Sequence, residues 1–89
     1  MTTKAYLLIE TRVGESKEVL NKIAQLDGVK SADPVTGPYD IIAIVEREDL
    51  SDIASLVTGE IGSINGISRK VTCVAFDLPP KTNPGIMLV

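Results

Sequence analysis

Residues 35–40, V-T-G-P-Y-D, combine a turn with groups that could bind a small ligand. Gly37 and Pro38 are typical of a tight turn, because proline fixes one backbone dihedral and glycine relaxes another. The Asp40 carboxylate could accept charge-assisted hydrogen bonds from an ammonium group, and nearby turn amides could receive a carboxylate. Such groups suit a zwitterion, for example a free amino acid. The alternative is that Asp40 only accepts hydrogen bonds from turn amides, as in an Asx turn.

Hydrophobic spacing predicts the elements that position this turn. It indicates strands at 4–12, 29–36, 39–46 and 67–76, and helices at 15–26 and 49–64. Asp49 is the expected N-cap of the second helix, and Gly28 and Gly66 are expected to end the two helices. The order β-α-β-β-α-β predicts the α+β ferredoxin-like fold. Its usual strand order, 4-1-3-2, places the second strand at an edge, where Pro34 is tolerated.

The first and third strands are apolar on both faces. One face of each carries Ala5, Leu7, Ile9, Ile41, Ala43 and Val45, and the other carries Tyr6, Leu8, Ile42 and Ile44. Right-handed crossovers place both helices on the same face of the sheet. The opposite face should be polar if water covered it. We therefore expect a second copy to cover it, sheet against sheet, in a homodimer of the dimeric α/β-barrel type.

Length and composition limit the class of protein. The 89 residues predict one domain, which we place at 1–77, followed by a proline-rich arm at 78–89. Residues 86–89, I-M-L-V, could add a short strand to a neighbour's sheet edge. A net charge of −3 argues against nucleic-acid and anionic membrane surfaces. The single cysteine, Cys73, fits a reducing cytoplasm, and the N-terminus resembles neither a signal peptide nor a membrane span.

The sequence lacks the patterns of the common enzyme and metal sites. It contains no histidine, which removes the commonest general base and metal ligand. One cysteine without histidine cannot form a zinc cluster, and the glycine-rich phosphate-binding motifs are absent. The acidic residues show no spacing typical of a catalytic pair. We therefore expect a non-enzymatic protein that uses neither a metal nor a cofactor.

Several motifs together resemble one family. They are A-Y-L-L-I-E, G-E-S-K-E-V-L, L-D-G-V-K-S-A, V-T-G-P-Y-D-I-I-A-I-V, I-N-G-I-S-R and V-T-C-V. The chain resembles the effector-binding (RAM) domain of the leucine-responsive regulatory protein/AsnC family, with the G-x-Y-D element as the most specific match. The resemblance implies homodimers that assemble into rings, such as octamers or decamers, with amino-acid effectors between dimers. It implies an effector site formed by Thr36, Gly37, Pro38, Tyr39 and Asp40, joined by Thr72 and Cys73.

The chain departs from that family in two places. Family regulators carry an N-terminal helix-turn-helix domain, whereas here a strand is predicted from residue 4. We therefore expect a stand-alone module without direct DNA binding, which would act on transcription indirectly, for example with a full-length regulator of the family. Pro38 stands where a polar or acidic residue is expected, which affects any side-chain contact at that position.

Three other functions stay open. An ACT-type amino-acid-binding module has the same element order and would use the loop at 11–16, T-R-V-G-E-S. A small dimeric α/β-barrel enzyme would use Tyr6 and Asp40 in a cleft between the sheet and the helices. A scaffold would assemble without any ligand.

Overall fold

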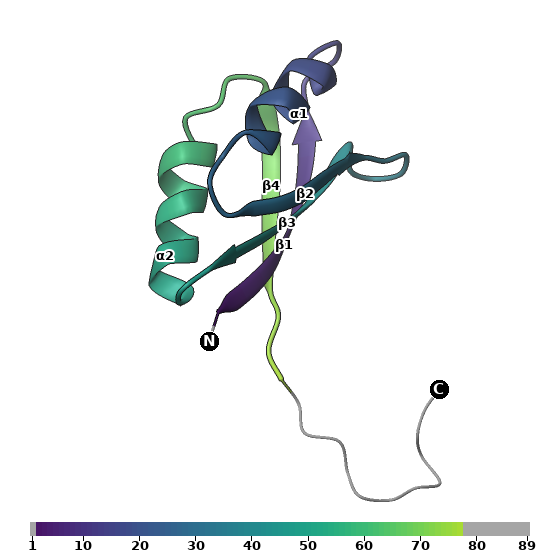
Figure 1. Cartoon of the computed structure of the whole chain (residues 1–89). Helices are drawn as coiled ribbons and strands as arrows, with labels where there is room; N and C mark the ends of the chain where they lie inside the picture. The colour runs from purple at the N-terminus through teal and green to yellow at the C-terminus, as the bar shows by residue number, and fades with distance from the viewer. Residues whose placement is uncertain (1, 78–89) are drawn as a thin grey trace, which may run out of the picture.

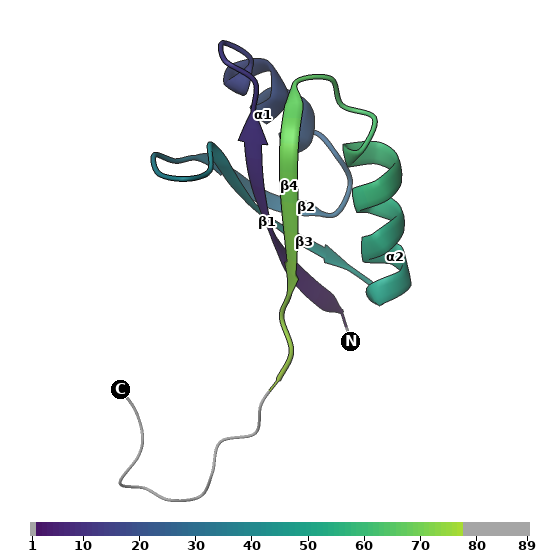
Figure 2. The same cartoon turned by 180° about the vertical axis from the view of Figure 1, so that it is seen from behind.

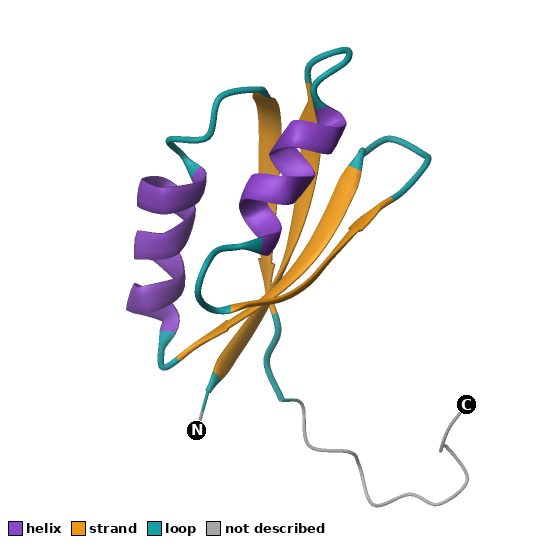
Figure 3. Cartoon of the chain, turned by 45° about the horizontal axis from the view of Figure 1, so that its top comes forward, coloured by secondary structure: helices purple, strands orange, loops and turns teal. Residues whose placement is uncertain are grey.

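Both helices pack on one face of a four-stranded antiparallel sheet (Figures 1 and 3). This computed structural model describes residues 2–77. The strands are β1 (Thr3–Thr11), β2 (Val29–Pro34), β3 (Ile41–Arg47) and β4 (Ile67–Val74). The helices are α1 (Ser16–Ala24) and α2 (Leu50–Ser55), and α2 continues as the π-helical segment η1 (Leu56–Ile61). The strand order β2-β3-β1-β4 confirms the predicted plan, with Pro34 at the end of an edge strand.

The second helix differs from the single α-helix predicted at 49–64. Its α-helical part ends at Ser55, and a wider π-helical coil follows. Within that coil, the hydroxyl of Thr58 donates to the carbonyl of Ala54 at 2.8 Å, and Gly59 adds backbone freedom. Both features disfavour a regular α-helix. Hydrophobic spacing could not reveal the change, because the apolar residues stay on the buried side through both segments.

The core lies between the helices and the sheet and consists of aliphatic side chains. The sheet contributes Ala5, Leu7, Ile9, Ile41, Ala43 and Val45, and the helices contribute Val19, Ile23, Ile53, Leu56, Val57 and Ile61. All twelve are buried. The structure therefore places this set of β1 and β3 side chains on the helix side of the sheet, a choice that the alternating pattern had left open.

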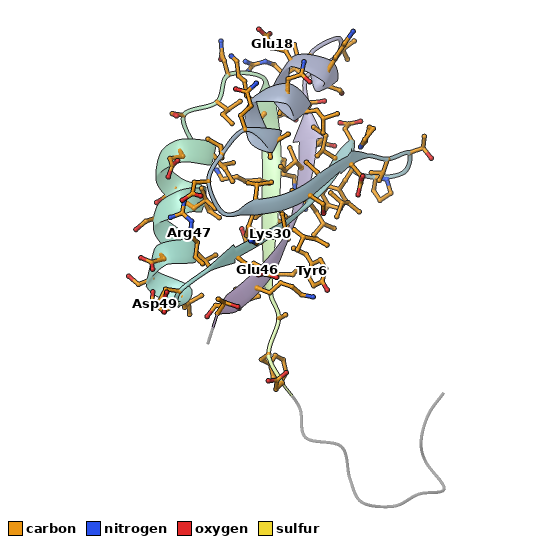
Figure 4. The ribbon with its side chains drawn as sticks, viewed as in Figure 1. Tyr6, Glu18, Lys30, Glu46, Arg47 and Asp49 are labelled. Carbon is orange, nitrogen blue, oxygen red and sulfur yellow. The ribbon has the colours of Figure 1, made fainter. Side chains whose placement is uncertain are left out.

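The opposite face of the sheet is also apolar at its centre. The strand register places Leu8 between Ile42 and Val71, and Tyr6 between Ile44 and Cys73. We call these six residues the open face. Figure 2 shows this side with the strands in front of α1, and in Figure 4 Tyr6 points away from α2. The same register puts charged residues at its rim, namely Lys4, Glu10, Glu46 and Arg69. An apolar centre with a polar rim is typical of protein interfaces.

Arg47 ties the turn after α1 to η1. The guanidinium of Arg47, which is labelled in Figure 4, donates to the carbonyl of Asp27 at 2.9 Å and to the carboxylate of Glu60 at 3.3 Å. Gly28 follows Asp27 with φ +94°, as its predicted turn requires, and a Cβ there would lie 2.5 Å from the Arg47 Nε. The α1–β2 turn is thus fixed by a glycine and an arginine together.

Asp49 caps α2 as predicted, since its carboxylate accepts a hydrogen bond from the Asp52 amide at 2.9 Å. Asp49→Ala is expected to lower the free energy of unfolding by about 1 kcal/mol, because that amide loses its partner. Urea denaturation measures the loss. The matched control is Ser51→Ala, an exposed change in the same turn. Equal losses in the two variants would contradict the cap.

The predicted arm at 78–89, with its added strand at 86–89, lies outside the described residues, so the division after residue 77 stays a prediction. Among residues 2–77, no helix is long and apolar enough to cross a membrane.

Candidate functional site

The loop at 35–40 joins β2 to β3 and projects from the edge of the sheet (Figure 1). The Val35 amide donates to the Asp40 carbonyl at 2.9 Å, which closes the loop. The Asp40 amide donates to the Ile9 carbonyl at 2.8 Å and so attaches the loop to β1. Gly37 has φ +137°, a value that L residues rarely adopt. The predicted turn at Gly37-Pro38 is therefore present.

The Asp40 side chain binds the end of β1. Its Oδ2 accepts hydrogen bonds from the Thr11 amide at 2.8 Å and from the Thr11 hydroxyl at 3.2 Å. Thr11 is buried, and its hydroxyl also hydrogen-bonds the hydroxyl of Ser16, the first residue of α1. The carboxylate thus accepts from a neighbouring strand and not from turn amides, as an Asx turn would require. Among the described residues, Asp40 Oδ1 has no hydrogen-bond donor.

Tyr39 lies beside Arg69 of β4. The Arg69 guanidinium carbon is 5.8 Å from the centre of the Tyr39 ring, within the range of a cation–π contact. In the register, Arg69 pairs with Glu10 of β1 at the rim of the open face. The loop therefore contributes one half-buried aromatic side chain and one half-buried carboxylate, while Thr36, Gly37 and Pro38 are exposed.

Thr72 and Cys73 do not join the loop within one chain. Thr72 pairs with Leu7 on the helix face of the sheet and lines a cavity against α2 and η1. Cys73 pairs with Tyr6 and is exposed on the open face. The two residues therefore point to opposite sides of β4, and only a neighbouring copy could bring either of them to a loop at 35–40.

The structure places three further residues near the loop, namely Thr11, Ser16 and Arg69. The sequence analysis had not identified them as part of the site. The predicted strand order already placed the start of the third strand beside the end of the first, so Thr11 could have been found from it. Predicting that Arg69 lies beside the loop would have required the exact register of β1 against β4. That register shifts between Glu10 and Thr11. No sequence signal fixes such an irregularity.

The two loops expected for an effector site and for an ACT-type site are neighbours. Thr11 and Ser16 begin and end the 11–16 loop, and Asp40 belongs to the other loop, yet their side chains form one hydrogen-bonded cluster. Tyr6 and Asp40, the pair considered for an enzyme, are not brought together in a cleft. Tyr6 lies on the open face, away from the helices, whereas Asp40 binds the end of β1.

Thr11→Val tests the cluster. The change keeps the shape of the side chain and the hydrogen bond from the residue 11 amide to Asp40. It removes the hydroxyl that hydrogen-bonds both Asp40 and Ser16. We expect the free energy of unfolding to fall by about 1–3 kcal/mol, because a charge-assisted hydrogen bond is lost. Thr36→Val, an exposed change in the loop itself, is the control and should be nearly neutral. A Thr11→Val protein as stable as the control would show that the cluster does not hold the loop.

Residues 4–84 match the model of the Lrp/AsnC ligand-binding domain. The chain belongs to this family. The relatives of this Lrp/AsnC domain include proteins described as HTH-type transcriptional regulators. One of them, the uncharacterised regulator PF0250 of Pyrococcus furiosus, is 32% identical over 60 residues, which is 67% of this chain and 40% of that protein. The chain thus spans less than half the length of that relative.

Solved structures show the same fold. The protein TTHA0845 from Thermus thermophilus is 34% identical with a TM-score of 0.82, over 89% of this Lrp/AsnC chain and 99% of that one. The regulator NMB0573 from Neisseria meningitidis, solved as a complex with L-Met, is 16% identical with a TM-score of 0.76, over 91% of this chain and 54% of that one. At that identity the likeness shows the fold alone. Among residues 2–77, no three His, Cys, Asp or Glu side chains gather as metal ligands would.

Proposed function

We propose that this chain is an oligomeric effector-binding module that senses an amino acid, or a similar small zwitterion, at a boundary between copies. The observation that carries the proposal is the state of the Asp40 carboxylate. Its Oδ2 is fixed by Thr11, so its position does not depend on a ligand. Its Oδ1 is free of donors among the described residues. A fixed carboxylate with one open oxygen is preorganised to accept hydrogen bonds from an ammonium group.

The rest of the binding site would come from the exposed loop and from a neighbour. Thr36, Gly37 and Pro38 are exposed and can meet another copy without moving the sheet. That copy would supply Thr72 or Cys73, which point to opposite sides of β4. The L-Met complex of NMB0573 supports an amino acid as the ligand class, because its regulator shares the fold.

The assembly would begin with the open face. Packing this face against its two-fold copy would bury Leu8, Ile42 and Ile44 and leave the charged rim at the edge, and dimers would then join into a ring. The relatives are HTH-type regulators, so the output would be transcriptional control in the cytoplasm. With a net charge of −3, this chain would act through a full-length regulator of the family and not through direct contact with DNA.

A thermal-shift screen of the amino acids tests the proposal. A ligand at about 100 times its dissociation constant adds about 2.7 kcal/mol of stability, which raises Tm by roughly 11–22 °C in a domain of this size. Asp40→Asn should abolish the shift, since the amide oxygen can still accept from Thr11 while the charge is gone. Asp27→Asn, the same change at an exposed carboxylate in another turn, should leave the shift intact. An equal shift in both variants would refute the role of Asp40.

A substitution in the 11–16 loop distinguishes an ACT-type site from the proposed site at the 35–40 loop. Val13 is fully exposed, so Val13→Trp adds bulk there without straining the backbone, whereas Gly14 has φ +83° and would be strained by any side chain. A Val13→Trp protein that keeps the ligand response supports the loop at 35–40. Loss of the response in this variant, with the response kept in Asp40→Asn, would favour the ACT-type site.

A further inference from the structure

An apolar groove runs between the second helical segment and the edge strand β4. It has a volume of about 240 Å³ and is lined by Leu50, Ile53, Ala54, Val57, Thr58, Thr72 and Val74. Leu50 is 57% exposed and Val74 is 40% exposed, so large apolar side chains stand open to water on both sides of it. The groove lies on the helix face of the sheet, opposite the open face, and a sheet-to-sheet dimer would leave it uncovered.

The strand beside this groove also has a free backbone edge. The sheet order β2-β3-β1-β4 ends at β4, and no other described strand pairs with its outer side. An extended segment could therefore pair with the free edge while placing every second side chain over the groove. Apolar side chains at those positions would cover Leu50 and Val74. The site thus fits a short, extended, apolar peptide.

The chain itself contains such a peptide outside the described residues. Residues 86–89 read I-M-L-V, and they follow the segment L-P-P-K-T-N-P-G at 78–85. We propose that residues 86–89 of one copy add a strand to the β4 edge of a second copy and occupy its groove. This assembly contact goes beyond the proposed effector site and does not depend on it.

The direction of the chain favours a second copy over the same copy. The Ala75 amide donates to the Lys4 carbonyl at 2.8 Å, so residues 75–77 continue straight on from β4 (Figure 2). The sequence that follows contains two consecutive prolines, Pro79 and Pro80, a pattern typical of an extended chain. If extended throughout, at about 3.1 Å per residue, the eight residues 78–85 would reach at most about 25 Å.

Disulfide trapping tests this contact in the full chain. Cys73→Ser provides a cysteine-free background. One chain then carries Ala54→Cys in the groove, and a second carries Met87→Cys or Leu88→Cys in the arm. Ala54 is exposed, so the change does not disturb the core. After mixing and mild oxidation, we expect a covalent two-chain product on a non-reducing denaturing gel, formed more by one of the two adjacent arm positions because strand side chains alternate.

The matched control places the first cysteine at Ala24, an exposed residue at the end of α1 that does not line the groove. The groove position should give about tenfold more product than Ala24→Cys, since docking raises the local concentration of the arm. Adding Leu50→Asp to the groove chain should reduce the product to the control level. Equal yields from the two positions, or no product with either arm position, would overturn the proposal. So would a chain carrying both cysteines that forms only an intramolecular link.

Discussion

Leu8→Asp is expected to disrupt the proposed sheet-to-sheet dimer. Leu8 lies at the centre of the open face, between Ile42 and Val71. In a sheet-to-sheet dimer the new carboxylate would be buried without a partner, at a cost of about 3–5 kcal/mol. The dissociation constant of the dimer should therefore rise by about a thousandfold. In a single chain the same side chain would face water, so the fold itself should survive.

Light scattering after size exclusion, over a range of concentrations, measures this effect. Circular dichroism of the same samples shows whether the monomer is folded. Asn21→Asp adds the same charge on the exposed side of α1 and should keep the mass of the original protein. A Leu8→Asp protein that dimerises as tightly as the original protein would show that the open face is not the dimer interface.

Gly66→Val is expected to cause the largest loss of stability. Gly66 precedes β4 with φ +107°, and a Cβ there would lie 2.8 Å from Val19 Cγ2 and 2.8 Å from Glu15 Oε1. Val19 is fully buried, so it cannot move aside cheaply. Backbone strain of about 1–3 kcal/mol adds to overpacking of about 1–3 kcal/mol. The free energy of unfolding should fall by about 2–6 kcal/mol in total.

Gly14→Val separates the two causes of that loss. Gly14 also has a positive φ, +83°, but a Cβ there would meet nothing within 4 Å. Its replacement should cost only the backbone strain, about 1–3 kcal/mol. Urea denaturation of both variants gives the difference directly. Equal losses would mean that the close approach of α1 to residue 66 adds nothing to the loss of stability in Gly66→Val.

The fold was predictable because each of its signals is local. Helical spacing, strand alternation and the edge position of Pro34 together led to the observed strand order. Alternation divided the side chains of β1 and β3 into two sets, since one residue of shift would reverse every side chain. Both sets are apolar, so alternation did not decide which set faces the helices. The π-helical segment did not follow, because a wider coil keeps the same residues buried.

The candidate site was predictable only in part, because its partners come from distant segments. The turn at Gly37-Pro38 is encoded by its own residues. The partner of Asp40 is Thr11, which lies 29 residues away, and the neighbour of Tyr39 is Arg69 on the far strand. The Thr11–Asp40 contact joins strands that are neighbours in the predicted order, whereas the position of Arg69 depends on the β1–β4 register, which shifts between Glu10 and Thr11. Thr72 and Cys73, adjacent in sequence, face opposite sides of the sheet, as strand neighbours must.

A crystal structure with the most stabilising amino acid tests the proposed function most directly. We predict that the ligand lies against the loop at 35–40, at a boundary between two copies. Its ammonium nitrogen should be about 2.7–3.2 Å from Asp40 Oδ1, while Oδ2 keeps its bonds to Thr11. A ligand bound elsewhere, without contact to the Asp40 carboxylate, would contradict the account.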